Sequence, residues 1–283
     1  MRVILLGAGE RPGVMETVEK LRPEIDRCCD VVLADFCGEC DLSDIEADLV
    51  IIFGGDGSVL RAAHQMGSRQ RPTLTVNLGT LGFLSNVRPE ELITLLERPD
   101  LLALPIIEHL LLRCCVYRQR EDNSSLLLAD SICLNEVLIQ GGTPFKINHI
   151  DLFIDGEPIT TYRCDGLILS TPVGSTAHNL SAGGPILRKD LGVVVLSPIS
   201  PHSLSYRPVV DSAERHFELQ TRDPLSYVIL DGVMTASIIP GDIVSVRKAD
   251  QTFKMVAIPG HGDYRMLQEK FGWSGSVHSI RND

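Results

Sequence analysis

The sequence lacks any uninterrupted apolar run that approaches the ~18 residues of a membrane-spanning helix. Near the start of the chain, the first apolar stretch extends only from Val3 to Leu6, which is too short for the apolar region of a signal peptide. We therefore expect a cytoplasmic protein that has no contact with a membrane.

An excess of positive charge is also lacking. The chain has 26 Lys and Arg against 37 Asp and Glu, which gives a formal net charge of −11. Such a protein repels DNA and RNA at long range, so we expect no nucleic-acid partner. It repels a nucleotide as well, so an anionic ligand needs local binding groups such as backbone N–H groups, a helix N-terminus or a divalent cation.

The cysteines lack the spacing of a metal site. Cys37 and Cys40 form a C-x-x-C pair, and Cys28 and Cys29 precede it, but no second ligand pair follows at a spacing typical of zinc. A chain of 283 residues does not need disulfides to fold. We therefore predict reduced thiols that pack in the core or lie in loops.

The hydrophobic pattern predicts two domains of different class. The first hundred or so residues alternate short apolar runs with helical periodicity, which is typical of a parallel sheet covered by helices on both faces. The predicted strands are 3–6, 31–34, 49–53 and 74–77, and the predicted helices are 14–21 and 59–66. Further along, short apolar runs are separated by Gly, Pro, Asp and Asn, and helical periodicity is scarce.

We therefore predict an α/β N-terminal domain with a parallel sheet, residues 1–101, and a β-rich C-terminal domain, residues 102–258. Within the second domain, Ile243 to Arg247 and Phe253 to Ile258 read as the two strands of a hairpin around a polar turn. The tail from Tyr264 to Phe271 reads as helical.

Gly54-Gly55-Asp56-Gly57-Ser58 follows the buried strand 49–53 and begins a helix. Parallel sheets place ligand sites at this position, and glycine lets the backbone approach a phosphate or a sugar closely. An aspartate repels phosphate, but it is suited to a hydroxyl that must lose its proton or to a metal-bridged phosphate. The alternative is a tight turn in which Asp56 caps the helix.

A longer segment, from Asp165 to Pro185, leads from an apolar strand into a run rich in Ser, Thr and Gly. Hydroxyls and free N–H groups concentrate there, without the Gly-Lys-Ser/Thr of a P-loop. We interpret it as a binding site rather than as a structural loop.

Two shorter motifs are ambiguous. Asn135 and Glu136 interrupt an apolar run, and one of them could be a solvated edge residue because neighbouring side chains in a strand point to opposite faces. The stretch from Gly7 to Pro12 nearly matches the G-x-G-x-x-G fingerprint of dinucleotide-binding dehydrogenases, with Asp35 closing the second strand, but Pro12 replaces the third glycine.

Together these segments resemble those of NAD kinases. The GGDG tetrapeptide alone also occurs in lipid kinases and resembles a motif of phosphofructokinases, whereas the long Ser/Thr/Gly block and a P-H-S-L-S segment are much more specific to NAD kinases. In chain order, the matching segments are Gly54–Gly57, Asn77–Leu84, Asn135–Glu136, Asp165–Pro185, Ser197–Pro208 and Asp231–Gly232.

The resemblance implies a two-domain fold whose last helical segment, 259–283, returns to the first domain. It implies phosphorylation of the 2′-hydroxyl of the adenosine ribose of NAD by ATP or another donor such as polyphosphate, with Mg²⁺ or another divalent cation, in a homodimer or homotetramer. In this reading Asp56 is the catalytic base, and no metal ligand is assigned.

The resemblance also implies contacts with NAD. Asp56 and the backbone of Gly57 would contact the ribose, Asn135 and Glu136 the ribose or adenine, and Asp231 the site near the ribose. The remaining expected binding residues, at the adenine or the nicotinamide end, are Arg163, Asp165, Thr176, Ala177, His178, Asn179, Leu180, Ser181 and Ser200.

Three positions depart from the family pattern. His178 stands where Tyr is usual, Val233 stands where the family has Gln, and Ser58 replaces Thr. Histidine stacks on a base with less area than tyrosine. The changes at His178 and Val233 leave open a non-catalytic relative that binds NAD. The GGDG tetrapeptide leaves open a second alternative, another GGDG kinase with a lipid or sugar acceptor.

Overall fold

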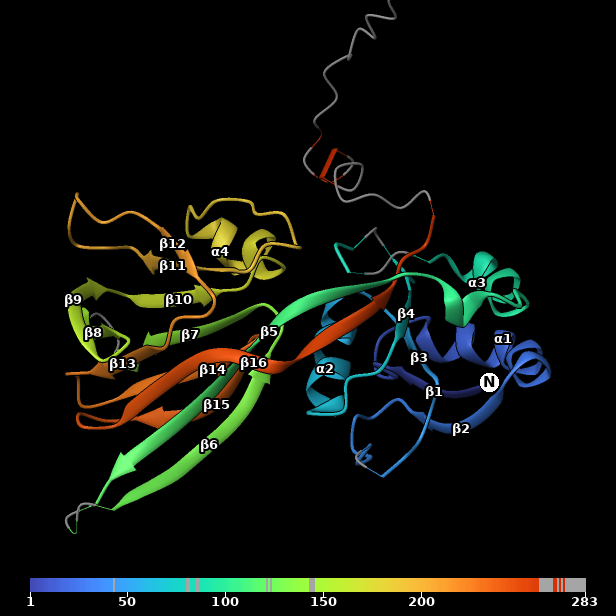
Figure 1. The fold of residues 1–283 in the computed structure, drawn as a ribbon, viewed down its shortest axis with the longest axis horizontal. Helices are drawn as coiled ribbons and strands as arrows, with labels where there is room; N and C mark the ends of the chain where they lie inside the picture. The colour runs from blue at the N-terminus through green and yellow to red at the C-terminus, as the bar shows by residue number, and fades with distance from the viewer. Residues whose placement is uncertain are drawn as a thin grey trace, which may run out of the picture.

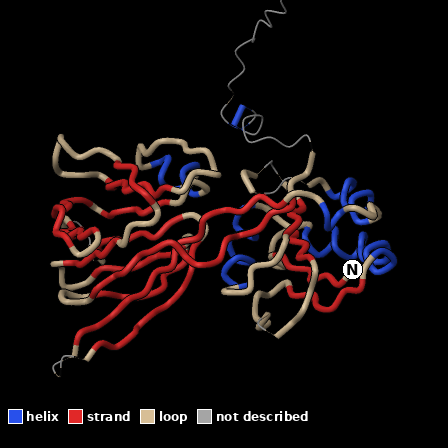
Figure 2. The backbone as a smooth tube through the Cα atoms, viewed as in Figure 1, coloured by secondary structure: helices blue, strands red, loops and turns tan. Residues whose placement is uncertain are grey.

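The computed structural model describes residues 1–42, 44–79, 82–84, 87–120, 122, 124–142, 146–259, 267, 268, 270 and 272. Figure 1 shows two lobes: the N-terminal lobe with most of the helices, and a second lobe built largely of strands. The same division is visible in Figure 2, where helices gather in one lobe and strands fill the other.

The N-terminal lobe is a parallel sheet. Its strands are β1 (Arg2–Gly7), β2 (Asp30–Asp35), β3 (Leu49–Phe53) and β4 (Thr73–Val76), in the spatial order β2-β1-β3-β4. All three neighbouring pairs are parallel. The central strands β1 and β3 are buried on both faces, so they read in sequence as continuous apolar runs.

Helices cover both faces of this sheet. On one face, α1 (Val14–Cys28) and α3 (Pro89–Leu96) pack against a buried cluster that includes Val3, Leu5 and Phe53. On the other face, α2 (Asp56–Met66) packs against a cluster that includes Ile4 and Ile52. The predicted parallel α/β domain is therefore confirmed.

The second lobe contains two facing sheets. One is a six-stranded antiparallel sheet in the order β12-β11-β10-β7-β14-β15. Its strands are β7 (Glu136–Gly141), β10 (Gly166–Ser170), β11 (Val193–Ile199), β12 (Val209–Ser212), β14 (Ser226–Leu230) and β15 (Val233–Ile238).

The facing sheet continues the N-terminal one, because β16 pairs with β4 through Met255 and Thr73 and extends into the second lobe. There it pairs with β5 and β13, and the sheet continues through β6, β8 and β9. These strands are β5 (Ile106–Gln119), β6 (Ser125–Cys133), β8 (Asn148–Ile154), β9 (Glu157–Cys164), β13 (Phe217–Thr221) and β16 (Ile243–Val256).

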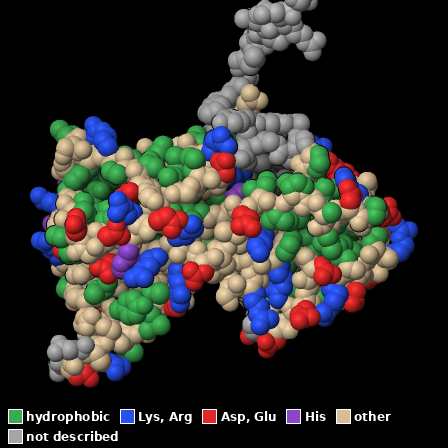
Figure 3. Space-filling model, in the orientation of Figure 1, with side chains coloured by type: hydrophobic (Ala, Val, Ile, Leu, Met, Phe, Trp, Pro, Cys, Tyr) green, Lys and Arg blue, Asp and Glu red, His purple; other side chains and the backbone are tan. Residues whose placement is uncertain are grey.

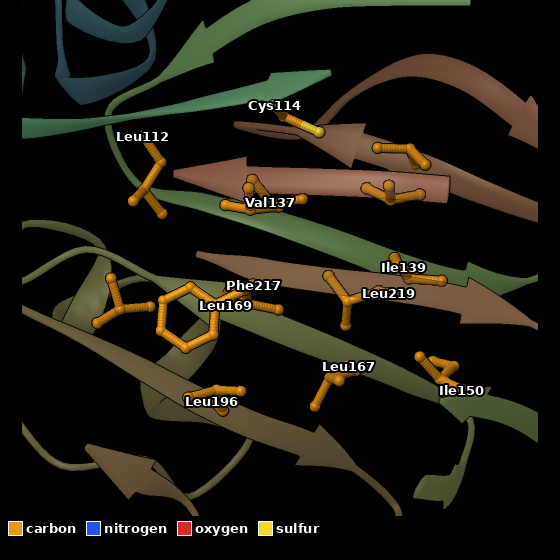
Figure 4. Packing of buried hydrophobic residues seen from close by; sticks show 14 of the residues in the cluster. Leu112, Cys114, Val137, Ile139, Ile150, Leu167, Leu169, Leu196, Phe217 and Leu219 are labelled. Carbon is orange, nitrogen blue, oxygen red and sulfur yellow. The ribbon is translucent and has the colours of Figure 1, made fainter. Parts of the chain in front are cut away.

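The core of the second lobe lies between these two sheets. Phe217 and Leu219 come from the larger sheet, and Leu167, Leu169 and Leu196 come from the smaller one; all five are at most 1% exposed. Figure 4 shows these side chains meeting in the space between the strands. Buried and half-buried residues alternate along β13 and β14, and in β13 the half-buried positions are polar, which explains why that strand lacks a continuous apolar run.

The predicted hairpin at residues 243–258 is wrong. The structure has one strand, β16, which pairs with β5 along its length, and the register shifts between Lys248 and Thr252. The polar stretch is a bulge rather than a turn, because the strand continues through the register shift. Within it, Ala249 is 4% exposed and packs in the cluster around α2. The predicted helix at 264–271 falls mostly outside the described residues.

Two further expectations concern cysteines and membrane segments. All eight cysteines are free thiols, and burial raises the pKa of Cys164 to about 12, as expected for an inert core thiol. Among the described residues, no helix is both long enough and apolar enough to cross a membrane.

Candidate active site

The GGDG segment is a sharp connection from β3 to α2. Gly54 has φ 138°, and a Cβ built on it would stand 2.9 Å from the Cβ of Ser58, so the position requires glycine. Gly55 occupies the N-cap of α2 without a side-chain cap. The alternative in which Asp56 caps the helix is therefore wrong: Asp56 is already inside the first turn.

The carboxylate of Asp56 is held by a distant segment. Oδ2 accepts the backbone N–H of Phe83 and Oδ1 accepts that of Leu84, each at 2.9 Å. Each oxygen keeps further acceptor capacity, since a carboxylate oxygen has more than one lone-pair site. The side chain is 31% exposed, so it is fixed in direction while it stays open to a ligand.

Two lysines that the sequence analysis did not identify contact this carboxylate or the segment that holds it. Lys189 donates to the carbonyl oxygen of Phe83 at 2.8 Å. Lys270 has its Nζ 4.0 Å from Oδ2 of Asp56 and 4.3 Å from the centre of the Phe83 ring. Neither lies in a motif, which is why neither was found. They supply the local positive charge that an acidic protein needs to hold a phosphate.

Asn135 and Glu136 lie at the start of β7 in the second lobe. They are 9% and 7% exposed, so neither is the solvated edge residue that the sequence allowed. Asp231 holds this turn: its Oδ2 accepts the N–H of Leu134 at 2.8 Å, and its Oδ1 accepts those of Asn135 at 2.7 Å and Glu136 at 3.1 Å.

The Glu136 carboxyl has an unusual environment. Burial, followed by the negative charge of Asp231, raises its pKa to about 8. Its Oε2 is buried without a hydrogen-bond partner among the described residues. A protonated carboxyl with a free polar atom can donate to a ligand acceptor as well as accept, which suits a sugar or a base.

The Ser/Thr/Gly block begins where β10 ends. Thr171 donates its N–H to the carbonyl of Asn135 at 2.8 Å and its hydroxyl to that of Leu134 at 2.6 Å. Its hydroxyl oxygen also accepts the N–H of Gly174 at 3.1 Å. The block therefore lies directly against the Asn135–Glu136 turn, although the two motifs are far apart in sequence.

Within the block, the residues differ in what they offer a ligand. Asn179 is fully buried: its Nδ2 donates to the carbonyls of Ser175 and Pro185, and its Oδ1 accepts from Ser197. Its side chain is thus used inside the protein, which the prediction of a substrate contact did not anticipate. Of the residues predicted between 176 and 181, the exposed or half-buried ones are Thr176, Ala177, His178, Leu180 and Ser181.

The residues expected at the nicotinamide end form a separate group. Arg163 and Asp165 are exposed, at the end of β9 and just before β10. Ser200 is exposed with φ 47°, an uncommon conformation for serine, and it follows β11. The N–H of Asp165 bonds to the carbonyl of Ile199, which brings these residues together.

The near-match to a dehydrogenase fingerprint does not form the expected loop. In that motif the helix begins within the glycine segment, whereas α1 begins only at Val14 after Gly13 in a left-handed conformation. Arg61 of α2 donates to the carbonyls of Gly7 and Phe36, so a side chain already fills the end of β1.

The surface charge is mixed rather than concentrated in one place. Figure 3 shows basic and acidic side chains interspersed over both lobes in the face in view, rather than one broad basic patch. In the part of the chain that the structure describes, no group of three or more His, Cys, Asp or Glu could hold a metal ion.

A carboxylate fixed at a helix N-terminus, with a lysine beside it, lies where a strand of the parallel sheet ends. The helix behind it reaches a buried polar turn and a hydroxyl-rich block in a second lobe. This combination is typical of a nucleotide-dependent phosphotransferase.

Comparisons with known proteins identify the family. Residues 9–99 match the ATP-NAD kinase N-terminal domain, and residues 134–258 match the ATP-NAD kinase C-terminal domain. The chain is 47% identical over 278 residues to the NAD kinase of Rhodopirellula baltica, covering 98% of this chain and 88% of the relative. It is 36% identical over 228 residues to that of Syntrophotalea carbinolica, covering 80% and 78%. The chain belongs to the NAD kinase family and is an enzyme of that class.

Solved structures share the fold. Yeast NADH kinase, solved in complex with NADH, superposes with a TM-score of 0.84 over 99% of this chain and 90% of that chain. An NAD kinase from Archaeoglobus fulgidus, in complex with ATP, gives 0.73 over 96% and 98%. Both are 24% identical in sequence, so they support the two-domain fold class.

Proposed function

We propose that this NAD kinase transfers the γ-phosphoryl group of ATP to the 2′-hydroxyl of the adenosine ribose of NAD, with Asp56 as the general base. One observation carries the proposal: the Asp56 carboxylate is aimed by two backbone N–H groups yet remains partly exposed beside Lys270. A positioned carboxylate with free acceptor sites can receive the proton of a hydroxyl.

In the proposed reaction one bond to phosphorus forms and one breaks, and Asp56 takes up the proton that is released. The ribose oxygen forms a bond to the γ-phosphorus, and the bond from that phosphorus to the β,γ-bridging oxygen breaks. The nucleoside diphosphate leaves with the electron pair, and the hydroxyl proton passes to Asp56. Because the transition state is loose, positioning and charge neutralisation supply most of the rate enhancement.

The NAD-binding surface in this proposal is the Asn135–Glu136 turn together with the exposed part of the Ser/Thr/Gly block. Glu136 has a free buried oxygen, which supports a hydrogen bond to the ribose or adenine. His178 is exposed at the start of α4 (His178–Ser181), where its ring can stack on the base. Gly57 would approach the ribose through its backbone.

The nicotinamide end would contact Arg163, Asp165 and Ser200. These three residues are exposed. We also propose a homodimer or homotetramer, which the resemblance to NAD kinases implies and which light scattering on the purified protein tests.

The described residues fit a divalent cation that is held mainly by its substrate. Mg²⁺ usually takes one or two carboxylates and fills its shell with phosphate oxygens and water, so a site without a protein cage is suitable. Because Asp56 is the proposed base, phosphate oxygens of the substrate and water, rather than this carboxylate, would hold most of the cation's coordination shell. When bound, the cation neutralises negative charge on the triphosphate.

We also propose that the functional units are residues 1–101 with 259–283, and residues 102–258. These boundaries lie just before β5 begins and just after β16 ends, and the pairing of β16 with both β4 and β5 supports a junction of paired strands rather than a flexible linker.

A coupled assay tests the proposed function. Purified protein, ATP, Mg²⁺ and NAD are mixed, and NADP is detected with an NADP-specific dehydrogenase. Asp56→Asn should lose roughly 10²–10⁴-fold in kcat while it still binds NAD by calorimetry. Glu16→Gln, which removes a first-turn carboxylate from α1, is the matched control and should keep wild-type turnover. Near wild-type kcat in Asp56→Asn would remove Asp56 as the base.

A further inference from the structure

A side-chain hydrogen bond links the helix of the GGDG motif to the second lobe. His64, on α2, places its Nε2 2.9 Å from Oδ2 of Asp231, which lies between β14 and β15. The Asp231 side chain is 1% exposed and that of His64 is 25% exposed. The two residues are 167 positions apart in sequence, so only the fold brings them together.

Asp231 is already committed to the turn that carries Asn135 and Glu136. It accepts the three backbone N–H groups of residues 134–136, and its own N–H donates to the carbonyl of Glu136 at 3.2 Å. It adopts φ 49°, which is uncommon for a residue other than glycine. A buried carboxylate with these partners is a fixed anchor rather than a group free for substrate.

The same helix begins at the reacting end of the site. Asp56 is the first residue of α2, and His64 follows about two turns later. Between them, Val59, Ala62 and Ala63 pack in one buried cluster with Leu134 and Val173 of the second lobe. Apolar packing of this kind is non-directional, so it permits small sliding that a hydrogen bond does not.

We propose that His64 is a positioning residue for phosphoryl transfer: through Asp231 it fixes the helix that carries Asp56 relative to the turn that carries Asn135 and Glu136. The proposal rests on the proposed roles of these three residues in the reaction. Phosphoryl transfer tolerates little displacement between base, acceptor and phosphorus, so a loose helix lowers the rate even when substrate binds.

The arrangement predicts different kinetic signatures for the two partners. Removing the His64 donor leaves the three backbone N–H groups on Asp231, so the Asn135–Glu136 turn keeps its shape. His64→Leu should therefore lower kcat about tenfold while KM for NAD stays within about twofold. Asp231→Asn disturbs the turn itself, because its amide N–H₂ opposes backbone donors, and it should raise KM for NAD as well.

The experiment compares His64→Leu with a rescue variant and a control. His64→Gln places an amide donor near the position of Nε2 and should restore kcat to within about threefold of wild type. Gln65→Leu is the control: Gln65 also lies on α2, but its bonds run to Asp35 and Cys40 inside the first lobe. It should leave kcat unchanged.

Calorimetric titration with NAD gives the fraction of folded, binding-competent protein in each sample, so a partly unfolded variant cannot imitate a low kcat. Full stoichiometry, a tenfold loss in His64→Leu and recovery in His64→Gln support the proposal. A loss that His64→Gln does not recover, or one that Gln65→Leu shares, overturns it. If His64→Leu keeps the wild-type kcat while Asp56→Asn loses it, the positioning role of His64 is overturned and the proposed function stands. If both variants keep the wild-type kcat, the proposed function itself is overturned.

Discussion

Gly174 lies against the backbone of Asn135 so closely that no side chain fits between them. A Cβ built on Gly174 would stand 2.6 Å from the carbonyl carbon of Asn135 and 2.7 Å from its Cα. Both residues are buried. The Ser/Thr/Gly block and the Asn135–Glu136 turn are thus in direct van der Waals contact, and the geometry of one depends on that of the other.

Gly174→Ala is therefore expected to damage stability and NAD binding together. The obstacle is backbone rather than the end of a flexible side chain, so the turn itself must move. We expect a loss of about 1–3 kcal/mol in the free energy of unfolding and at least a tenfold weaker Kd for NAD. Urea denaturation and calorimetry measure the two effects.

Gly192→Ala is the matched control for this substitution. Nothing lies within 4 Å of a Cβ built on Gly192, and its φ is not in the left-handed region. Its stability and NAD affinity should match wild type. Equal stability of Gly174→Ala and Gly192→Ala would show that the close approach of Gly174 to Asn135 does not matter.

A substitution at Asn179 distinguishes two roles of its side chain: hydrogen bonds that stabilise the fold, and direct contact with NAD. Its side-chain amide bonds to Ser175, Pro185 and Ser197, with no exposed surface. Asn179→Ala leaves those buried groups without partners and should cost about 2–4 kcal/mol of stability. Thermal unfolding checks this, with the exposed Ser181→Ala as the comparison.

If Asn179 instead contacts substrate mainly through its side chain, Asn179→Ala would weaken NAD binding and leave the unfolding temperature unchanged. That result would contradict the internal role that the hydrogen bonds indicate.

Glu136 predicts how stability depends on pH. Burial and the charge of Asp231 raise its pKa from 4.5 to about 8, so the folded state holds a proton that the unfolded state releases at lower pH. The stabilisation from this proton is complete below about pH 4.5 and is lost as the pH rises to about 8. Its size is on the order of a few kcal/mol.

Glu136→Gln removes this dependence because an amide does not titrate. The difference in unfolding free energy between the variant and wild type should shift in favour of the variant from about pH 5 to 8 and then level off. Urea denaturation at several pH values measures it. Parallel curves for the two proteins would mean that Glu136 titrates in the folded state as it does in an open chain.

Much of the first lobe could be predicted because its signals are local. Strands buried on both faces, such as β1 and β3, read as continuous apolar runs, and the GGDG glycines directly follow one of them. The hairpin prediction at β16 failed since a polar run in sequence looks like a turn. The bulge is defined by the pairing of β16 with β5, a distant segment whose register the local sequence does not show.

The site was only partly predictable for a related reason. Sequence motifs identified Asp56, Asn135 and Glu136, but a motif does not say which side chains are free to meet a ligand. The carboxylate of Asp231 accepts backbone N–H groups of the Asn135–Glu136 turn. Its partner His64 has no sequence motif that identifies it, because the pair forms across the two lobes.

Lys270 places a positive charge beside the proposed base. Its ammonium group lies 4.0 Å from Asp56 and over the Phe83 ring, in a protein of net charge −11. A cation at the carboxylate should draw a triphosphate toward a site that otherwise repels it. Lys270→Gln should therefore raise KM for ATP about five- to tenfold, whereas Lys270→Arg, which keeps the charge, should stay within about twofold.

Added salt should narrow the difference in KM for ATP between wild type and Lys270→Gln, since screening weakens the attraction. A KM for ATP that is unchanged in Lys270→Gln at low salt would mean that this lysine only packs on Phe83, and that the triphosphate depends on other groups.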